Sequence, residues 1–90
     1  MIARRLVVRG LVQGVFYRHS CRREANRHQV NGWVRNGEDG TVAAHFEGDA
    51  EAVEAMVDWC RTGPPEAQVD SVEVTELEPA GLRDFRVVQD

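Results

Sequence analysis

The sequence predicts an α+β fold in which two helices cover one face of an antiparallel sheet, forming a two-layer sandwich. Three observations lead to this prediction. Segments whose apolar residues alternate, as in strands, are interspersed with two segments whose apolar residues recur every three or four positions, as in helices. Each helical segment has a single apolar stripe and therefore needs one surface to pack on. The helical segments follow the first and the third strand-like segment, which is typical of a sheet covered on one face.

The first predicted strand and the first predicted helix are separated by a short loop. The strand spans residues 4–12, where apolar residues alternate. One face of this strand carries Leu6, Val8, Gly10 and Val12. From Tyr17 the spacing changes, which predicts a helix that continues to His28. The stripe of this helix that we expect to be buried consists of Tyr17, Cys21, Ala25 and His28.

A hairpin and a second helix follow. Residues 30–36 and 41–47 have strand character, and the letters Asn-Gly-Glu-Asp-Gly between them are typical of a tight turn. Asp49 is a good N-cap for the second helix, which we expect to end before the Thr-Gly-Pro-Pro sequence at 62–65. The stripe of this helix that we expect to be buried consists of Ala50, Val53, Met56, Val57 and Cys60.

Two further strands complete the predicted sheet. Residues 69–77 alternate over a long stretch, and residues 85–88 form a short final strand. The order is therefore βαββαβ with one additional terminal strand, which is the ferredoxin-like arrangement. Right-handed connections then make the first and second strands parallel, with a partner strand between them. Their carboxyl ends would lie at the same edge of the sheet.

Length and charge restrict the size and the chemistry of the protein. A chain of 90 residues is the size of one domain, and we expect residues 1–90 to form a single domain without a large internal cavity. The net charge of −4 conceals an asymmetry, because residues 1–35 carry eight arginines and one acid, whereas the remainder carries three arginines and fourteen acids. The basic third of the chain favours an anionic ligand, although the two regions can also interleave in the fold.

The sequence lacks the signals of membrane, disulfide-rich and metal-binding proteins. No apolar run approaches the ~18 residues of a membrane span, and the first ten residues lack the apolar core of a signal peptide. We therefore expect a cytoplasmic protein, and a monomer. We expect Cys21 and Cys60 to be buried and reduced, although both fall on predicted helices and a disulfide between them is the alternative. His19, His28 and His45 are not spaced as a catalytic cluster, and we expect structural or solvated roles for them.

The segment between the first strand and the first helix has the composition of an anion-binding loop. Gly14 permits a tight turn and the close approach of a ligand. The first N–H groups of a helix have no acceptor within the helix and lie at the positive end of its dipole, so those of residues 13–18 could surround an anion. Arg18 adds a guanidinium whose donors match a phosphate. The same sequence could also represent a simple turn glycine followed by a solvated arginine. Spacing alone therefore leaves both the anion-binding and the purely structural interpretation open.

Asn36 ends the second predicted strand and precedes Gly37. An Asn-Gly pair is typical of a hairpin turn, and a purely structural role is one interpretation. A fixed carboxamide can also both donate to and accept from a water molecule. Because the first and second strands are predicted to be parallel, Asn36 and Arg18 would lie on the same rim of the sheet.

These two segments resemble the two sequence motifs of the acylphosphatase family. The first motif is present as Val8-x-Gly10-x-Val12-Gln13-Gly14-Val15-x-Tyr17-Arg18. The second is present as Gly32-Trp33-Val34-Arg35-Asn36, followed by Gly40-x-Val42 and Gly48. The later stretch GPPEAQVDSVEV is also similar to the family. The resemblance therefore spans essentially the whole chain.

The resemblance implies an activity and a role for each site residue. It implies a hydrolase that cleaves the carboxyl–phosphate bond of acyl phosphates and releases a carboxylate and inorganic phosphate. No metal or other cofactor would be needed, and the partners would be a small acyl phosphate and inorganic phosphate, not nucleic acid or a membrane. Arg18 and Asn36 would be catalytic, Arg18 by binding the phosphate and Asn36 by holding the attacking water. The N–H groups of the phosphate site would be those of Gln13, Gly14, Val15, Phe16, Tyr17 and Arg18.

Four residues depart from the pattern of the family. Tyr17 stands where phenylalanine is usual, so its hydroxyl needs a partner. Cys21 stands where threonine is common, and His28 where an apolar residue is usual. Gln29 stands where the first helix often ends in glycine, and a left-handed conformation there would cost about 1 kcal/mol. We expect these differences to affect packing more than chemistry, because both catalytic candidates are retained.

Two other classes of function are compatible with the sequence. Ferredoxin-like sheets also bind RNA through aromatic residues on their open face; Trp33 and Phe46 would be the candidates, although the net negative charge opposes this. The loop could also bind a phosphorylated metabolite without hydrolysing it, as a sensor does. If the protein is an acyl phosphate hydrolase, we expect broad tolerance of acyl groups, because a shallow site built mostly of backbone donors contacts the phosphate more than the acyl group.

Overall fold

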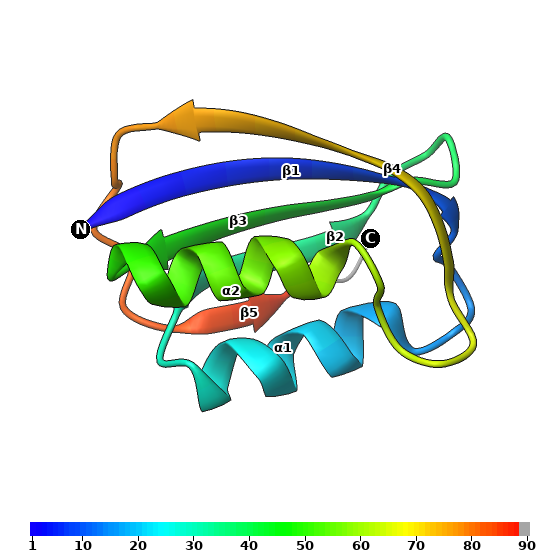
Figure 1. The fold of residues 1–90 in the computed structure, drawn as a ribbon, viewed down its shortest axis with the longest axis horizontal. Coiled ribbons are helices and arrows are strands. Elements are labelled where there is room, and N and C mark those ends of the chain that lie inside the picture. The colour runs from blue at the N-terminus through cyan, green and yellow to red at the C-terminus, as the bar shows by residue number, and fades with distance from the viewer. Residues whose placement is uncertain (89–90) are drawn as a thin grey trace.

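The computed structural model describes residues 1–88 and confirms the predicted ferredoxin-like α+β sandwich (Figure 1). Within these residues, two helices lie on the same face of a five-stranded sheet (Figure 1). In chain order, the elements are β1 (Ile2–Leu11), α1 (Tyr17–Arg27), β2 (Asn31–Asn36), β3 (Val42–Gly48), α2 (Ala50–Cys60), β4 (Gln68–Leu77) and β5 (Phe85–Val87).

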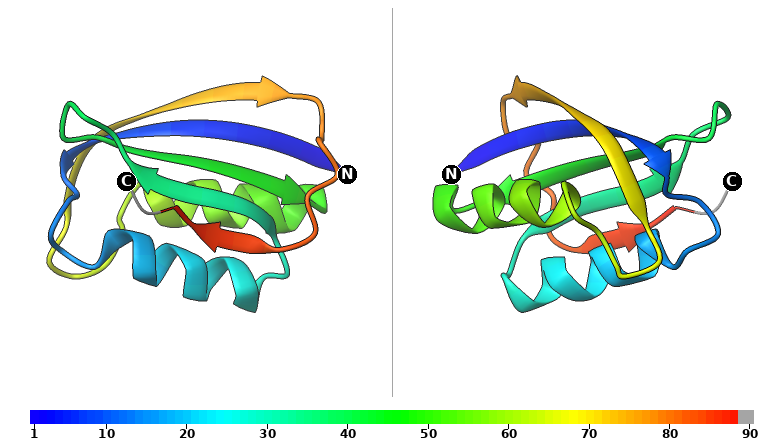
Figure 2. Two further views of the ribbon diagram at one scale, coloured as in Figure 1. Left: turned by 180° about the vertical axis from the view of Figure 1, so that it is seen from behind. Right: turned by 45° about the vertical axis from the view of Figure 1, so that its right-hand side comes forward.

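The strands follow one another across the sheet in the order β4-β1-β3-β2-β5. β3 is antiparallel to both β1 and β2, so β1 and β2 point in the same direction, as predicted, and their carboxyl ends meet at one edge. β5 departs from the expected antiparallel sheet, because it pairs with β2 in parallel. The connection 78–84 crosses the opposite edge of the sheet (Figure 2) and brings β5 to the end at which β2 begins.

The hydrophobic core lies between the sheet and the two helices. Both cysteines are buried in it and carry free thiols, as expected. The buried residues of the helices are Tyr17, Cys21 and Ala25 on α1 and Val53, Met56 and Cys60 on α2. They belong to one cluster with sheet residues that include Leu6, Val8, Val34, Ala44 and Phe46.

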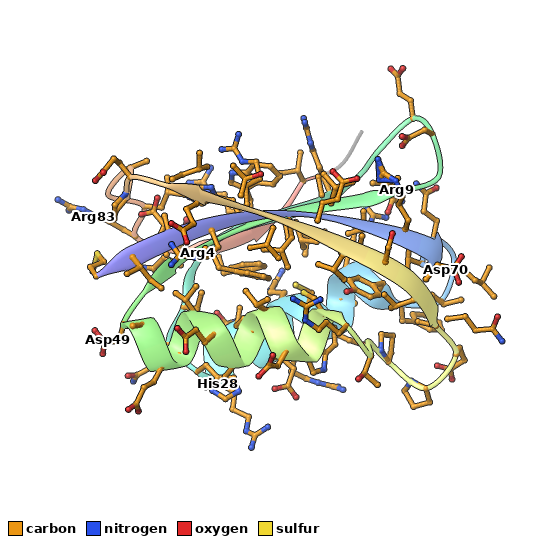
Figure 3. The ribbon with its side chains drawn as sticks, turned by 45° about the horizontal axis from the view of Figure 1, so that its top comes forward. Arg4, Arg9, His28, Asp49, Asp70 and Arg83 are labelled. Atoms are coloured by element: carbon orange, nitrogen blue, oxygen red, sulfur yellow. The ribbon has the colours of Figure 1, made fainter. Side chains whose placement is uncertain are left out.

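At the helix ends, three predictions differ from the structure. α1 ends at Arg27, so His28 leaves the buried stripe and lies half-buried, with Nε2 3.7 Å from a carboxylate oxygen of Glu24. Ala50 is exposed because it is the first residue of α2, ahead of the turns that pack on the sheet. Asp49 occupies the N-cap position at the start of α2 (Figure 3), but its side chain makes no capping hydrogen bond.

Gln29 follows α1 in a left-handed backbone conformation, with φ of 59°. Its N–H donates to the carbonyl of Asn26, and the next N–H, that of Val30, donates to the carbonyl of Ala25. This conformation therefore closes the carboxyl end of the helix. The side chain of Gln29 is exposed and offers little packing to offset the backbone strain.

Gln29→Gly should raise the free energy of unfolding by about 0.5–1 kcal/mol. Glycine adopts the left-handed conformation without strain, and this gain exceeds the additional conformational entropy of glycine in the unfolded chain. Gln29→Ala is the matched control, because alanine retains the strain and should not stabilise. Denaturant unfolding measures both variants, and a glycine variant less stable than wild type would contradict the assignment of strain to this position.

Glu47 is a buried carboxylate that holds the connection 78–84 against the sheet. Its side chain accepts hydrogen bonds from the N–H groups of residues 80–82, at 2.6–3.1 Å, and lies 2.8 Å from Nε2 of His45. Nη2 of Arg5 lies 3.3 Å from Nδ1 of the same histidine. Because a guanidinium can only donate, Nδ1 accepts and Nε2 carries the proton that is shared with Glu47. Burial acts to raise the pKa of the Glu47 carboxyl, but these hydrogen bonds outweigh burial and hold the pKa below its ordinary value of 4.5.

Glu47→Gln should lower the free energy of unfolding by about 3 kcal/mol, because an amide cannot accept from all the donors that surround the carboxylate. Glu76→Gln is the control: this side chain is 81% exposed and lies 3.8 Å from Arg4, a pair that contributes about 0.5 kcal/mol or less. Equal stability of wild type and Glu47→Gln at pH 7 would contradict the anchoring role.

The same substitution predicts a dependence on pH. A pKa lowered by folding means that the contribution of Glu47 is present above the pKa of the unfolded chain and is lost as the pH falls through the lower folded value. The stability difference between wild type and Glu47→Gln should therefore be constant near neutrality and should shrink below about pH 4.5. Unfolding curves measured for both proteins from pH 7 to pH 3 test this.

Candidate active site

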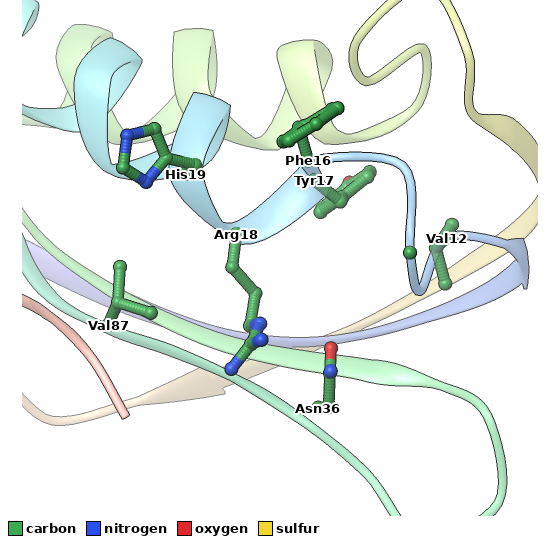
Figure 4. A pocket seen from close by; sticks show the side chains of 8 residues that line it. Val12, Phe16, Tyr17, Arg18, His19, Asn36 and Val87 are labelled. Carbon is green, nitrogen blue, oxygen red and sulfur yellow. The ribbon is translucent and has the colours of Figure 1, made fainter. Parts of the chain in front are cut away.

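A cleft of about 400 Å³ opens at the edge of the sheet where β1 and β2 end. It lies between the loop that follows β1, the first turn of α1 and the end of β2 (Figure 4). The structure thus brings Arg18 and Asn36 to one place, although they are distant in sequence. The residues that line the cleft include Gly14, Phe16, Tyr17, Arg18, His19 and Asn36.

The loop between β1 and α1 contains two left-handed backbone conformations. Gly14 has φ of 76°, and Phe16, the N-cap residue of α1, has φ of 63°. None of the N–H groups of residues 14–19 donates to an acceptor within residues 1–88; the first that does is that of Ser20, which bonds to the carbonyl of Phe16 at 3.0 Å. Successive N–H groups without acceptors at the amino end of a helix can surround an anion.

Arg18 extends from the first turn of α1 across the cleft toward the end of β2 (Figure 4). Its Nη1 donates to the carbonyl of Val88 at 3.2 Å, which orients one side of the guanidinium. The other donors of the five that a guanidinium carries have no acceptor within residues 1–88. Among the described residues, no carboxylate forms an ion pair with Arg18.

Asn36 is the last residue of β2, and its carboxamide oxygen points toward the loop (Figure 4). This Oδ1 atom is buried and has no hydrogen-bond partner within the described part of the chain. A buried oxygen without a donor is energetically costly and is uncommon in folded proteins. Such an atom is typical of a site that a bound molecule completes.

Gln13 and Val15, whose N–H groups were expected in the phosphate site, have side chains directed elsewhere. Nε2 of Gln13 donates to the carbonyls of Gly37 at 2.8 Å and Thr41 at 2.9 Å, within the turn that follows Asn36. These two bonds tie the loop to the turn and so fix the loop relative to Asn36. Val15 packs against the core. Neither side chain lines the cleft.

Tyr17 anchors the start of α1 to the end of α2. Its hydroxyl, which departs from the family pattern, donates to the carbonyl of Cys60 at 2.7 Å. Its ring lies 5.3 Å from that of Trp59, and a Cβ on Gly63 would come within 2.6 Å of it. Burial, and after it the proximity of Cys60, raises the pKa of Tyr17, so the hydroxyl keeps its proton. Burial likewise raises the pKa of the Cys21 thiol, which makes it unreactive.

The sequence did not predict the bridging side chain of Gln13 or the exposed ring of Phe16. For Gln13, no sequence signal indicates that an amide reaches carbonyls more than twenty residues away. For Phe16, its position between a turn glycine and the first helical residue was a usable signal, because an aromatic ring at such a turn has little core to enter.

Within residues 1–88, no group of three or more His, Cys, Asp or Glu side chains is placed to hold a metal ion. His19 lines the cleft, whereas His28 and His45 contact Glu24 and Glu47 respectively. Within the same residues, no helix is long and apolar enough to cross a membrane.

Comparison with known proteins assigns this chain and its fold to one family. The family model of acylphosphatases matches residues 4–87. An acylphosphatase from Rubrobacter xylanophilus is 56% identical over 85 residues, which are 92% of this chain and 76% of the relative. An acylphosphatase from Thermococcus kodakarensis is 54% identical over 83 residues, which are 92% of this chain and 91% of the relative.

Solved structures agree with the sequence comparisons. The crystal structure of acylphosphatase from Bacillus subtilis matches with a TM-score of 0.95 and 34% sequence identity, and the match covers 99% of this chain and 100% of that one. The likeness therefore extends over the sheet, both helices and the loop that forms the cleft. The chain belongs to the acylphosphatase family, and it is a hydrolase of acyl phosphates.

Proposed function

We propose that residues 13–18 and Arg18 bind the phosphate of a small acyl phosphate, that Asn36 holds the attacking water, and that no metal takes part. Membership of the acylphosphatase family supports the reaction. One observation supports the roles of the residues. A single cleft combines successive N–H groups without acceptors, an arginine outside any described ion pair, and a buried amide oxygen without a donor.

Binding of the phosphate follows from the charges at the start of α1. An acyl phosphate carries its negative charge on the phosphoryl oxygens. Within this site, the N–H groups of residues 14–18 lie at the positive end of the helix dipole, and the Arg18 guanidinium adds a full charge with several donors. Because the loop and α1 hold these groups in place, they can stabilise the charge of the transition state without reorganising.

Hydrolysis requires a water in line with the bond that breaks. Oδ1 of Asn36 would accept a hydrogen bond from this water and direct its oxygen at phosphorus. The water oxygen forms the new bond to phosphorus, the phosphorus–oxygen bond to the acyl group breaks, and the carboxylate leaves with the bridging oxygen. Both protons of the water remain with the phosphate product, or one of them passes to solvent. A carboxylate is a good leaving group, so no general acid is needed.

The remaining expectations belong to the same proposal. We propose a monomer in the cytoplasm, a single domain of residues 1–90, no cofactor and broad tolerance of acyl groups. One contiguous core cluster within the described residues supports a single domain. Light scattering coupled to size-exclusion chromatography tests the monomer. A spread of kcat/KM beyond a few hundredfold among small acyl phosphates would contradict the broad tolerance.

No observation favours RNA binding by the open face of the sheet. Trp33 and His45 are paired across β2 and β3, as are Gly32 and Phe46. Phe46 is fully buried in the core beneath the helices, so it lies on the other face from Trp33 and cannot stack on a base. The other alternative was a sensor that binds acyl phosphates without hydrolysing them. Catalytic release of phosphate from an acyl phosphate would exclude this role.

Hydrolysis in water enriched in oxygen-18 tests the proposed chemistry directly. Attack on phosphorus places the label in inorganic phosphate and leaves the carboxylate unlabelled. Attack on the carbonyl carbon would place the label in the carboxylate. Mass spectrometry of both products, with benzoyl phosphate as substrate and a no-enzyme control, distinguishes the two. Label in benzoate above the control would overturn the role given to Asn36.

A further inference from the structure

We propose that the ring of Phe16 is the wall against which the acyl group of the substrate lies, so that the site favours acyl phosphates with a flat apolar acyl group. This inference rests on the proposed function, because it takes the phosphate to lie in the loop and the water to lie at Asn36. It assigns a specificity-determining role to the side chain of Phe16, a residue of which only the backbone N–H group was expected in the site.

The first support for this role is that Phe16 is both exposed and strained. The residue is 73% exposed, so it contributes little to the core. Its backbone is left-handed, with φ of 63°, a conformation that costs a bulky residue about 1 kcal/mol or more and that glycine or asparagine adopts more readily. A large apolar residue that is strained and does not pack is unexpected from folding alone, and such positions cluster at functional sites.

The second support is the position of the ring in the cleft. Phe16 lines the cleft together with Arg18 and Asn36. In Figure 4, Phe16 lies at the start of α1 and Asn36 lies across the cleft from that turn, with the Arg18 side chain to one side of both. In phosphoryl transfer the attacking and leaving oxygens are roughly in line. A water held at Asn36 therefore directs the leaving carboxylate, and the acyl group attached to it, away from Asn36 and toward the side of Phe16.

The chemistry of this wall indicates the class of acyl group. A phenyl ring offers an apolar face that packs best on another flat or apolar group. The neighbouring lining residues Val12 and Val87 are also apolar. Because the cleft is open and the ring covers only one side of the acyl group, the preference is moderate. It remains compatible with the broad tolerance proposed above.

The test compares benzoyl phosphate with acetyl phosphate. We expect the ratio of their kcat/KM values to fall about tenfold in Phe16→Ala and to be largely restored in Phe16→Leu. Alanine keeps the left-handed strain, and any disturbance of the loop backbone affects both substrates equally and cancels in the ratio. Leu11→Ala is the matched control, because Leu11 is an apolar residue that is 55% exposed but does not line the cleft; its ratio should equal that of wild type.

Benzoylphosphonate and acetylphosphonate lack the bridging oxygen and therefore cannot be hydrolysed there. Measuring how they bind separates this inference from the proposed function. The ratio of their dissociation constants, measured by calorimetry, should change in Phe16→Ala as the kinetic ratio does. A ratio that is the same in wild type and Phe16→Ala would overturn the role of Phe16, whether or not activity falls. Absence of hydrolysis by wild type, with a ratio of binding constants that still depends on Phe16, would overturn the catalytic proposal alone.

Discussion

Arg18→Ala is expected to lower kcat/KM for hydrolysis of an acyl phosphate on the order of 10³-fold or more. The substitution removes from the cleft a guanidinium that has no acid neighbour among the described residues, so charge on the phosphoryl oxygens is stabilised only by N–H groups. Both the bound substrate and the transition state lose this interaction, and the affinity for inorganic phosphate should fall as well. Steady-state release of phosphate from benzoyl phosphate, with phosphate as a competitive inhibitor, measures both quantities.

Two further variants determine whether the loss of kcat/KM depends on the position of the arginine and on the planar shape of its guanidinium. Arg22→Ala removes an exposed arginine from the next turn of α1, outside the cleft, and should change kcat/KM by less than about twofold. Arg18→Lys keeps the charge but loses the planar set of donors, and should retain only a fraction of the activity. Activity of Arg18→Ala within tenfold of wild type would contradict the phosphate-binding role.

Asn36→Ala is expected to lower kcat about 10²-fold while leaving the inhibition constant of inorganic phosphate nearly unchanged. The buried Oδ1 atom of Asn36 has no hydrogen-bond partner among residues 1–88, so its removal does not break a described contact. The loss should therefore appear in the step that uses the water and not in the binding of phosphate. An inhibition constant measured with each variant separates the two effects.

Asn31→Ala is the matched control for Asn36, because Asn31 is the same residue type at the opposite end of β2. Its Nδ2 donates to the carbonyl of Leu82 at 2.9 Å, far along the strand from the cleft. This variant should lose some stability and keep the wild-type kcat. Asn36→Ala with a normal kcat, or with a change confined to the inhibition constant, would show that Asn36 does not hold the water.

The elements and their order could be predicted because each one depends on local patterns. The alternation in β1, the stripe on α2 and the turn between β2 and β3 are all visible within a dozen residues. From these, the general rule for connections gave the parallel arrangement of β1 and β2, which in turn placed Arg18 and Asn36 on one rim. Through topology, the sequence therefore predicted that these two candidate residues would lie at one edge of the sheet, and the structure brings them together there.

The details that were not predicted depend on contacts between distant segments. The direction of β5 is determined by the path of the connection 78–84, and this connection is held by Glu47, a charged residue whose burial no local pattern indicates. The bridge from Gln13 to the turn after Asn36 depends in the same way on where the loop lies after folding. Gln29 shows a different case: the resemblance to a family in which the first helix often ends in glycine raised the question of a left-handed conformation there, and the structure has that conformation.

Release of inorganic phosphate from benzoyl phosphate, measured side by side for wild type and Arg18→Ala after exhaustive treatment with a chelator, tests the central claim most directly. The proposed site predicts that wild type hydrolyses the substrate at the same rate with and without chelator, and that Arg18→Ala releases phosphate at close to the uncatalysed rate. Three results would contradict it: no hydrolysis by wild type, a rate that the chelator abolishes and a divalent cation restores, or an Arg18→Ala variant as active as wild type.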